Sequence, residues 1–348
     1  MTIPTEPIGS LPRPPELLAA LSAHPEELEH LQNHAVAETL ARLEGAGCPV
    51  LVDGDQAKPD VLTYPLAGSA ALAPDGAVIP YDDGHTRQLP RLTGGPFRYG
   101  LRAGTYVRAA KKRTDRPVKA TVIAPSALSL LYPAEPLDGY SREAFLADLA
   151  DEAEADIRDA LDAGAHSVQL DCGLARLTLK LDPSGGVLDH FIGLDNSVLE
   201  RFTREERARI GAHTYPGADQ GSTHSLDVDY ADLLPKLFQL KVGNFYLQLA
   251  SEPDPERVLK VVAGHLRPDI RVFVGVTDPL DPRFETPEQV RDRVLAAARH
   301  IPVTQLGTCD DAGFATYADD STLSRDTAFA KIEARMKGTE LAATALGL

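Results

Sequence analysis

The 348-residue sequence contains no tryptophan, only three cysteines and no apolar run long enough to cross a bilayer. A small and odd number of cysteines argues against a disulfide scaffold and indicates a reducing compartment. The first residues do not show a basic region followed by an apolar stretch, which is the pattern of a secretory signal. We therefore expect a cytoplasmic protein without a membrane-spanning segment.

Basic residues are also scarce. The chain has 35 lysines and arginines against 51 aspartates and glutamates, which gives a formal net charge of −16. A surface this acidic repels phosphate backbones and anionic lipids, so we expect neither a nucleic-acid partner nor a membrane partner. The expected partner is a small-molecule substrate, and the composition leaves open whether the chain forms a homo-oligomer.

Short apolar runs that are typical of strands alternate with amphipathic helical segments along most of the chain. Some helical segments carry start signals, such as Ser141 before an acidic turn and Thr286 before a proline. No G-x-G-x-x-G turn follows a strand-like run, which argues against a doubly wound sheet. The strand-like runs are Pro7–Ser10, Val50–Asp53, Val118–Ile123, Ser167–Asp171, Arg209–His213, Asn244–Ala250, Arg271–Val276 and Thr304–Thr308. They predict one α/β domain over residues 1–348, a (β/α)₈ barrel with an inserted β-type excursion at Ala70–Arg98 after the second strand.

The carboxyl ends of barrel strands carry the chemistry of this fold, and three predicted strands end in ionisable or metal-capable residues. Asp171 and Cys172 end the fourth strand, His213 the fifth and Cys309 the eighth. Neighbouring strand residues point to opposite faces, so Asp171 and Cys172 can share the mouth only if the strand bulges. Asp171 is the better candidate, because a buried carboxylate without a functional partner is costly. We predict His213 and Asp171 as catalytic residues.

Two cysteines and a histidine at these strand ends form a candidate metal site. Zinc accepts sulfur and imidazole ligands together, and a catalytic zinc needs only three protein ligands. Cys172, His213 and Cys309 would supply them. The alternative is that both cysteines are small buried apolar side chains.

Other strand ends carry groups suited to binding an amino acid. Ile8–Ser10 offers a close backbone approach and a hydroxyl that can hold a carboxylate. Asp55, in an Asp-Gly-Asp segment, belongs either to a turn or to a site for an ammonium group. Gln248 and Asp278 lie where the sixth and seventh strands end. The predicted substrate-binding residues are Ile8, Gly9, Ser10, Asp55, Asp171 and Gln248, and Asp278 joins the predicted catalytic residues.

Taken in order, these segments resemble the carboxyl-terminal catalytic barrel of cobalamin-independent methionine synthases and their single-barrel relatives. The resemblance runs over nearly the whole chain. The matching segments are Ile8–Ser10, Asp53–Gln56, Gln169–Asp171, His213, Gly275–Asp278, Glu285, Asp310–Phe314 and Lys331. It implies a barrel that transfers a methyl or alkyl group to a thiol activated as a zinc thiolate, with a folate as the methyl donor.

The resemblance also assigns roles to particular positions. It places a substrate carboxylate at Ser10 and a substrate ammonium between Asp55 and Asp171. Of the zinc ligands it implies, His213 is kept, whereas Tyr215 and Ala312 stand at cysteine positions and Gln248 falls near a glutamate position. The tryptophan that stacks on the folate is absent, and Leu280 stands where the long synthases carry a proton-donating histidine.

Three functions are therefore open from the sequence. The first is a zinc-dependent alkyltransferase acting on an amino-acid thiol, with a zinc site relocated to Cys172, His213 and Cys309. The second is a metal-free lyase or transferase that uses His213 as the acid and base. The third is a catalytically silent protein that binds an amino acid or a thiol.

Overall fold

The computed structural model describes residues 2–23 and 26–348, and its centre is a parallel sheet. Six strands follow one another in the order β12-β11-β10-β7-β6-β5, each hydrogen-bonded to its neighbours. Their bounds are β5 Lys119–Ile123, β6 Ser167–Asp171, β7 Ile210–Thr214, β10 Asn244–Leu247, β11 Arg271–Gly275 and β12 Leu306–Cys309. Nearly every residue of these strands is buried, as expected where helices cover the sheet and side chains fill its interior.

The first two strands of the barrel are reduced to single bridges. Thr5 bridges to Thr308 on β12 and Leu51 bridges to Val118 before β5, both in the parallel sense. Leu11 N donates to Gly54 O at 3.0 Å and links these two segments to each other. The predicted eight-stranded parallel barrel is thus confirmed.

The bounds predicted for the first strand are wrong. Its ladder forms at Pro4–Glu6 instead of Pro7–Ser10, because Thr308 N donates to Pro4 O and Glu6 N donates to Thr308 O. Prolines lack the N–H that extends a ladder, and Pro4, Pro7 and Pro49 flank both bridges. These prolines explain why the two segments pair only briefly.

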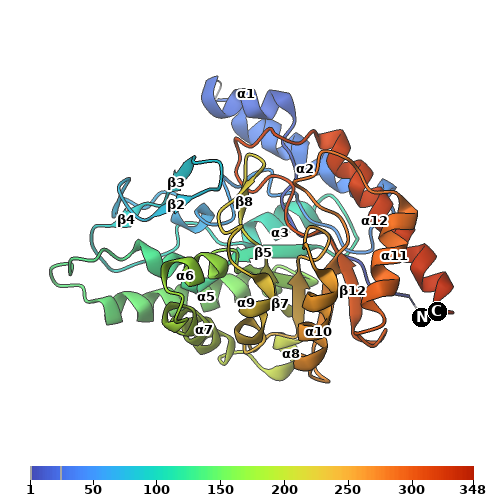
Figure 1. Cartoon of the computed structure of the whole chain (residues 1–348). Coiled ribbons are helices and arrows are strands. Elements are labelled where there is room, and N and C mark those ends of the chain that lie inside the picture. Colours follow the sequence, from blue (N-terminus) through green and yellow to red (C-terminus); the bar gives the residue numbers. More distant parts are fainter. Residues whose placement is uncertain (1, 24–25) are drawn as a thin grey trace.

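Helices surround the sheet (Figure 1). Ser141 Oγ accepts from Ala144 N at the start of α5, and Thr286 forms a capping box with Gln289 at the start of α11, so both predicted helix starts are confirmed. The helices are α1 Pro15–Ala23, α2 Leu28–Gly45, η1 Tyr64–Leu66, α3 Gly104–Lys111, α4 Pro125–Leu128, η2 Ser129–Leu131, α5 Arg142–Asp162, α6 Ala175–Leu181, α7 Gly186–Leu199, α8 Arg204–Arg207, α9 Tyr230–Leu237, α10 Pro255–His265, α11 Pro287–Ala297 and α12 Arg325–Ala345.

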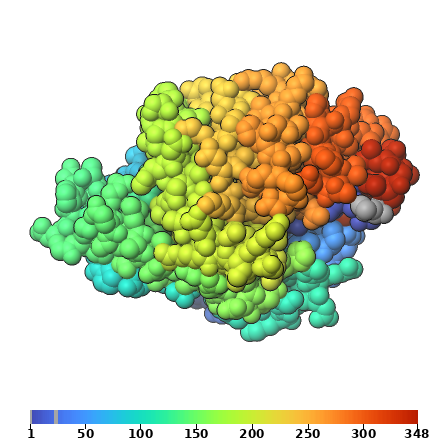
Figure 2. All heavy atoms as spheres, turned by 90° about the horizontal axis from the view of Figure 1, so that it is seen from below, coloured from blue at the N-terminus to red at the C-terminus, as the bar shows by residue number. Residues whose placement is uncertain are grey.

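Figure 2 shows a face covered mostly by the middle and carboxyl-terminal parts of the chain, in green to red. Among the described helices, none combines the length and the apolar character needed to cross a membrane.

The predicted excursion after the second strand is present as two small antiparallel pairs. The strands are β1 Leu72–Ala73, β2 Val78–Pro80, β3 Thr86–Gln88 and β4 Arg91–Leu92. β1 pairs with β4 and β2 pairs with β3. In Figure 1 this insertion lies to one side of the barrel, away from α11 and α12. A further short pair, β8 (Ala218–Asp219) with β9 (Ser222–Thr223), follows β7.

One buried carboxyl outside the barrel gives a testable pH dependence. Asp195 on α7 is 3% exposed and accepts hydrogen bonds from Ser126 N and Ser126 Oγ, both at 2.9 Å. Burial raises the pKa of Asp195 to about 7. The raised pKa favours the folded state below the ordinary pKa of the carboxyl, and this contribution is lost as the pH rises through about 7.

Asp195→Asn should therefore be more stable than the parent at pH 8, by on the order of 2–4 kcal/mol, because an amide keeps both contacts without a charge. The difference should shrink toward pH 4. Urea unfolding at both pH values measures it, and Asp189→Asn on the exposed side of α7 is the matched control. An equal stability difference at pH 4 and pH 8 would contradict the assignment.

Candidate functional site

The carboxyl ends of the strands bring together most of the predicted substrate-binding residues. They surround a cavity of about 20 Å³, which is roughly the space of one water molecule. Its walls are Ile8, Gly9, Ser10, Asp55, Val61, Thr121, Gln169, Asp171, Tyr215, Gly313 and Thr316. We call this space the small cavity. Five of the six predicted substrate-binding residues line it, and Gln248 does not.

His213 lies next to Asp171, which lines the small cavity, and one nitrogen of the His213 ring has no hydrogen-bond partner among the described residues. His213 Nε2 is 3.0 Å from Asp311 O, and because a carbonyl can only accept, Nε2 carries a hydrogen. Nδ1 is buried and has no hydrogen-bond partner among the described residues. It lies 3.9 Å from Asp171 Oδ2. The structure thus places the two predicted catalytic residues, His213 and Asp171, next to each other.

Asp171 connects His213 to the small cavity. Its Oδ1 accepts from Gly173 N at 2.9 Å, which holds the carboxylate at the strand end. The Tyr215 ring stacks on His213 with a centroid distance of 4.5 Å, and its hydroxyl contacts Asp171 and Thr316. Burial, with the nearby Asp171 charge, raises the pKa of Tyr215 well above its usual value, so this phenol stays protonated. Tyr215 therefore acts as a hydrogen-bond donor in the site, a role that its sequence position did not predict.

Asp55 is already paired with a cation of the chain itself. Lys58 Nζ lies 2.8 Å from Asp55 Oδ1, and both side chains are about 97% buried. Lys58 Nζ also donates to Thr121 O at 2.8 Å and to Thr121 Oγ1 at 2.6 Å, while Thr121 Oγ1 donates to Asp55 Oδ1. Asp55 has a positive φ of 52°, a conformation that the preceding glycine turn and Asp53 Oδ1, which accepts from Asp55 N, help to hold. In the carboxylate that the resemblance gives to a substrate ammonium, Oδ1 is thus already paired with Lys58.

The predicted metal site of Cys172, His213 and Cys309 is not formed. Cys172 packs in the main apolar core, and Cys309 packs inside the barrel against Ile8, Tyr246 and Phe273. Burial raises the pKa of both thiols well above the usual value, which disfavours the thiolate that zinc binds. Within residues 2–23 and 26–348, no group of three His, Cys, Asp or Glu residues could hold a metal ion. Strand alternation points Cys172 away from the face that Asp171 occupies, so these three side chains are not gathered in this structure.

The residues at the positions that the resemblance gives to zinc ligands do not fit a zinc ion either. His213 Nε2 is held by a carbonyl, the Tyr215 ring covers the imidazole, and Gln248 Nε2 donates to Glu252 Oε1. Ala312 has no ligand atom. The remaining donor atoms near His213 Nδ1 are those of Asp171, which are fewer than the three protein ligands that a catalytic zinc requires.

Two of the predicted residues lie outside the small cavity. Gln248 lines a larger cavity of about 380 Å³, together with Arg176, Tyr230, Glu252 and Leu280. Asp278 lines neither of these cavities: it is half-buried, its Oδ1 accepts from Leu280 N at 2.9 Å, and its N donates to Glu285 Oε1. Burial raises the pKa of Asp278. Among the described residues, no hydrogen bond or ion pair joins Asp278 to Asp171 or His213.

The insertion lies next to the small cavity. Arg87 on β3 contacts Asp219 and Asp319, with Nη2 at 3.1 and 2.7 Å from their carboxylates. Tyr81, which follows β2, stacks on His85 and meets Tyr317 with its hydroxyl at 3.1 Å. Tyr81 and Tyr317 line a second cavity of about 10 Å³ that also touches Asp171 and Tyr215. Through these contacts the insertion lies beside the strand ends that carry Asp171 and Tyr215.

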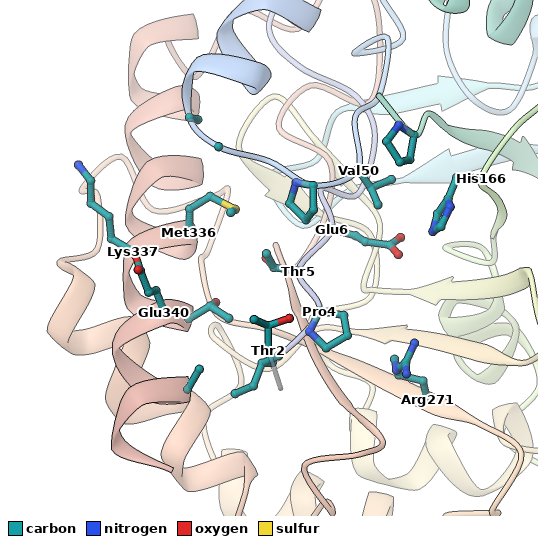
Figure 3. A pocket seen from close by; sticks show the side chains of 17 residues that line it. Thr2, Pro4, Thr5, Glu6, Val50, His166, Arg271, Met336, Lys337 and Glu340 are labelled. Carbon is teal, nitrogen blue, oxygen red and sulfur yellow. The ribbon is translucent and has the colours of Figure 1, made fainter. Parts of the chain in front are cut away.

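A cavity of about 750 Å³ lies at the opposite end of the barrel (Figure 3). It is bordered by Thr2–Glu6 and Val50, by His166 and Arg271 at the starts of β6 and β11, and by α12. Chemistry in this fold occurs at the carboxyl ends of the strands, whereas the amino ends serve stability. The size of this cavity therefore does not make it the candidate site.

The fold and the polar side chains around the small cavity define a (β/α)₈-barrel protein whose candidate site lies at the carboxyl ends of the strands. The sequence profile described as "Cobalamin-independent synthase, Catalytic domain" matches residues 3–330. The chain belongs to this family.

Curated relatives and solved structures agree with this assignment. The 5-methyltetrahydropteroyltriglutamate–homocysteine methyltransferase of Nitratidesulfovibrio vulgaris is 26% identical over 323 residues, and that of Ralstonia pickettii is 24% identical over 322 residues. Each alignment covers 90% of this chain but 39% of the relative, so the chain spans about two fifths of these proteins. A B12-independent methionine synthase from Shewanella sp. W3-18-1, in complex with selenomethionine, superimposes with a TM-score of 0.77, 21% identity and 99% coverage of both chains. A putative vitamin-B12 independent methionine synthase from Listeria monocytogenes gives 0.70, 18% and 98%. These two structures share the fold of this chain.

Proposed function

We propose that the chain transfers a methyl or alkyl group to a small thiol, and that Asp171 and His213, instead of a metal, take up the thiol proton. The observation that carries this proposal is that His213 Nδ1 is buried without a hydrogen-bond partner, 3.9 Å from Asp171 Oδ2 beside the small cavity. A ring nitrogen in this position is suited to hold a transferred proton, because an imidazolium and a carboxylate attract each other.

The transfer balances without a metal. The thiol proton passes by way of the Asp171 carboxylate to His213 Nδ1, and the sulfur electron pair forms a bond to the methyl carbon. The bond between that carbon and the donor breaks, and its electron pair leaves with the donor, which takes up one proton from solvent. His213 then releases the thiol proton to solvent, so the net reaction moves one methyl group and one proton. The names of the curated relatives suggest 5-methyltetrahydropteroyltriglutamate as the donor and homocysteine as the acceptor.

The size of the small cavity supports a thiol as the group that enters it. A space of about 20 Å³ holds a group of the size of one water molecule, such as a sulfhydryl, and not a whole amino acid. The rest of the substrate must therefore lie outside this cavity.

A transfer assay tests the proposal. The protein is incubated with homocysteine and methyl-labelled 5-methyltetrahydropteroyltriglutamate, and labelled methionine is measured. We expect methionine to form with the parent and to continue forming in the presence of a metal chelator. If no labelled thioether appears with homocysteine or with simple thiols, although these ligands bind, the chain is a binding protein and the proposal is wrong.

A further inference from the structure

The cavity of about 750 Å³ at the amino ends of the strands has the size and the walls of a small-molecule site (Figure 3). Sites of this kind measure roughly 300–1,000 Å³ and are mostly apolar with a few polar groups. We call it the amino-end cavity. Its apolar walls include Ile3, Pro4, Val50, Pro117, Met336 and Ala343. A ligand bound here would bury an apolar body, and the polar groups of the cavity decide its chemical class.

Glu6 places a buried carboxylate in the wall of the amino-end cavity. The residue is 6% exposed, and in Figure 3 its carboxylate extends toward His166. Its Oε2 accepts from Tyr246 Oη at 2.6 Å, whereas no described residue donates a hydrogen bond to Oε1. A carboxylate has about four acceptor sites, so a single donor leaves most of them unused. Glu6 would therefore gain from a further donor, and most of all from a charged one.

Lys119 offers another explanation for Glu6, because a buried lysine needs a counter-ion. Lys119 Nζ lies 3.5 Å from Glu6 Oε2, which is longer than a charge-assisted hydrogen bond. It donates instead to Gln169 Oε1 at 2.8 Å and to Pro7 O. Glu6 lines the amino-end cavity, whereas Lys119 and Tyr246 do not. The partners inside the barrel thus approach Oε2, and Oε1 is left for a group in the cavity.

The other ionisable residues of the amino-end cavity are exposed. They are His166, Arg271, Lys337 and Glu340. Water and salt screen exposed charges, whereas a buried carboxylate is screened much less. The net charge of −16 on the whole chain also favours the approach of cations. Glu6 therefore decides which charge a ligand in this cavity should carry.

We propose that the amino-end cavity binds a small protonated amine with an apolar body, an alkyl- or arylammonium ion, and that the ammonium donates to Glu6 Oε1. The carboxylate would then lie between two cations, with Lys119 beside Oε2 and the ligand at Oε1. This is a binding site and not a second catalytic site, in keeping with its place at the amino ends of the strands. It lies at the other end of the barrel from Asp171 and His213, so it does not depend on the proposed function.

Binding of phenethylamine at pH 7, measured by calorimetry, tests the proposal. Hydrocinnamate is an anion of similar size and phenethyl alcohol is its neutral counterpart, and each should bind the parent at least about 10-fold more weakly than the amine. Glu6→Gln keeps an acceptor for Tyr246 but removes the charge, so it should weaken amine binding about 10- to 100-fold. Glu340→Gln, which removes an exposed carboxylate of the same cavity, is the matched control and should change the affinity less than about 3-fold.

A second variant keeps the test decisive if Glu6→Gln does not fold because Lys119 has lost its nearest carboxylate. Ala343 lines the amino-end cavity from α12, and Ala343→Phe fills part of the space while leaving Glu6 in place. It should weaken phenethylamine binding by about 10-fold or more, because the apolar body of the ligand loses its room.

Several results would overturn the assignment. They are no binding of phenethylamine by the parent, and an unchanged affinity in a folded Glu6→Gln variant or in Ala343→Phe. Tighter binding of hydrocinnamate that is lost in Arg271→Gln would show an anion site instead. Loss of amine binding in Asp171→Asn but not in Ala343→Phe would place the ammonium in the small cavity. None of these measurements depends on methyl transfer, so a failure here leaves the proposed function untouched.

Discussion

Replacing His213 by glutamine should lower the rate of methyl or alkyl transfer about 10²- to 10⁴-fold, the usual contribution of a proton-transferring side chain. Glutamine is close in size and can still donate to Asp311 O, the contact that His213 Nε2 makes at 3.0 Å. It has no group that titrates, so no proton can be held opposite Asp171. The rate constant under saturating substrate measures this loss.

Two controls separate chemistry from folding in this experiment. His265 is the last residue of α10, and its imidazole contacts Val261 O and the Phe238 ring. His265→Gln removes this imidazole and should leave the transfer rate unchanged. The thermal unfolding midpoint of His213→Gln should stay within a few degrees of the parent. A rate within about 3-fold of the parent would show that His213 takes no part in the proton transfer.

Replacing Lys58 by methionine should destabilise the fold by about 3–5 kcal/mol, because it leaves the Asp55 carboxylate buried without a cation. Lys58 and Asp55 are 2.8 Å apart and almost fully buried. Methionine has a similar length but cannot donate to Asp55 Oδ1 or to Thr121. Equilibrium unfolding in urea at pH 7 gives the difference in free energy.

The double variant Lys58→Met, Asp55→Asn tests the cause of this loss. Removing both charges should recover most of the stability, because the main cost of the single change is an unpaired buried charge. A single-variant loss below about 1 kcal/mol would mean that Asp55 is satisfied without Lys58, and Asp55 would then be available to a substrate ammonium.

The architecture could be predicted from the sequence because strand-like and helical periodicities alternate through most of the chain. Six predicted strands are ladders in the structure, although β10 ends at Leu247 instead of Ala250. The first two strands pair only at Thr5 and Leu51, and the periodicity of the sequence did not show that the flanking prolines would cut their ladders short.

The candidate site could be predicted only in part. Alternation along β6 predicted that only one of Asp171 and Cys172 faces the mouth of the barrel, and the cost of burying a carboxylate favoured Asp171, which lines the small cavity. Spacing could not show that Cys309 would point into the packed barrel interior against Tyr246 and Phe273. Lys58 was overlooked because a lysine three residues after a turn aspartate is ordinarily solvated, and its burial depends on Thr121 from a distant strand.

The residues that line the 380 Å³ cavity could not be predicted from local sequence patterns either. Arg176 on α6 and Glu252 after β10 are far apart in the chain, and no periodic pattern relates them. Loops bring them together, and loop geometry depends on the completed barrel. The signal that the sequence did offer was Gln248, a polar residue that ends an otherwise apolar strand-like run.

The most direct test of the account is the metal dependence of the transfer reaction, measured on protein purified without a chelator or a histidine tag. We predict fewer than about 0.1 zinc per chain and an unchanged rate after treatment with a chelator, since a catalytic zinc needs three protein ligands and the site near His213 does not supply them. Near-stoichiometric zinc, with a rate that is lost on chelation and restored by adding zinc, would contradict the assignment of the thiol proton to Asp171 and His213.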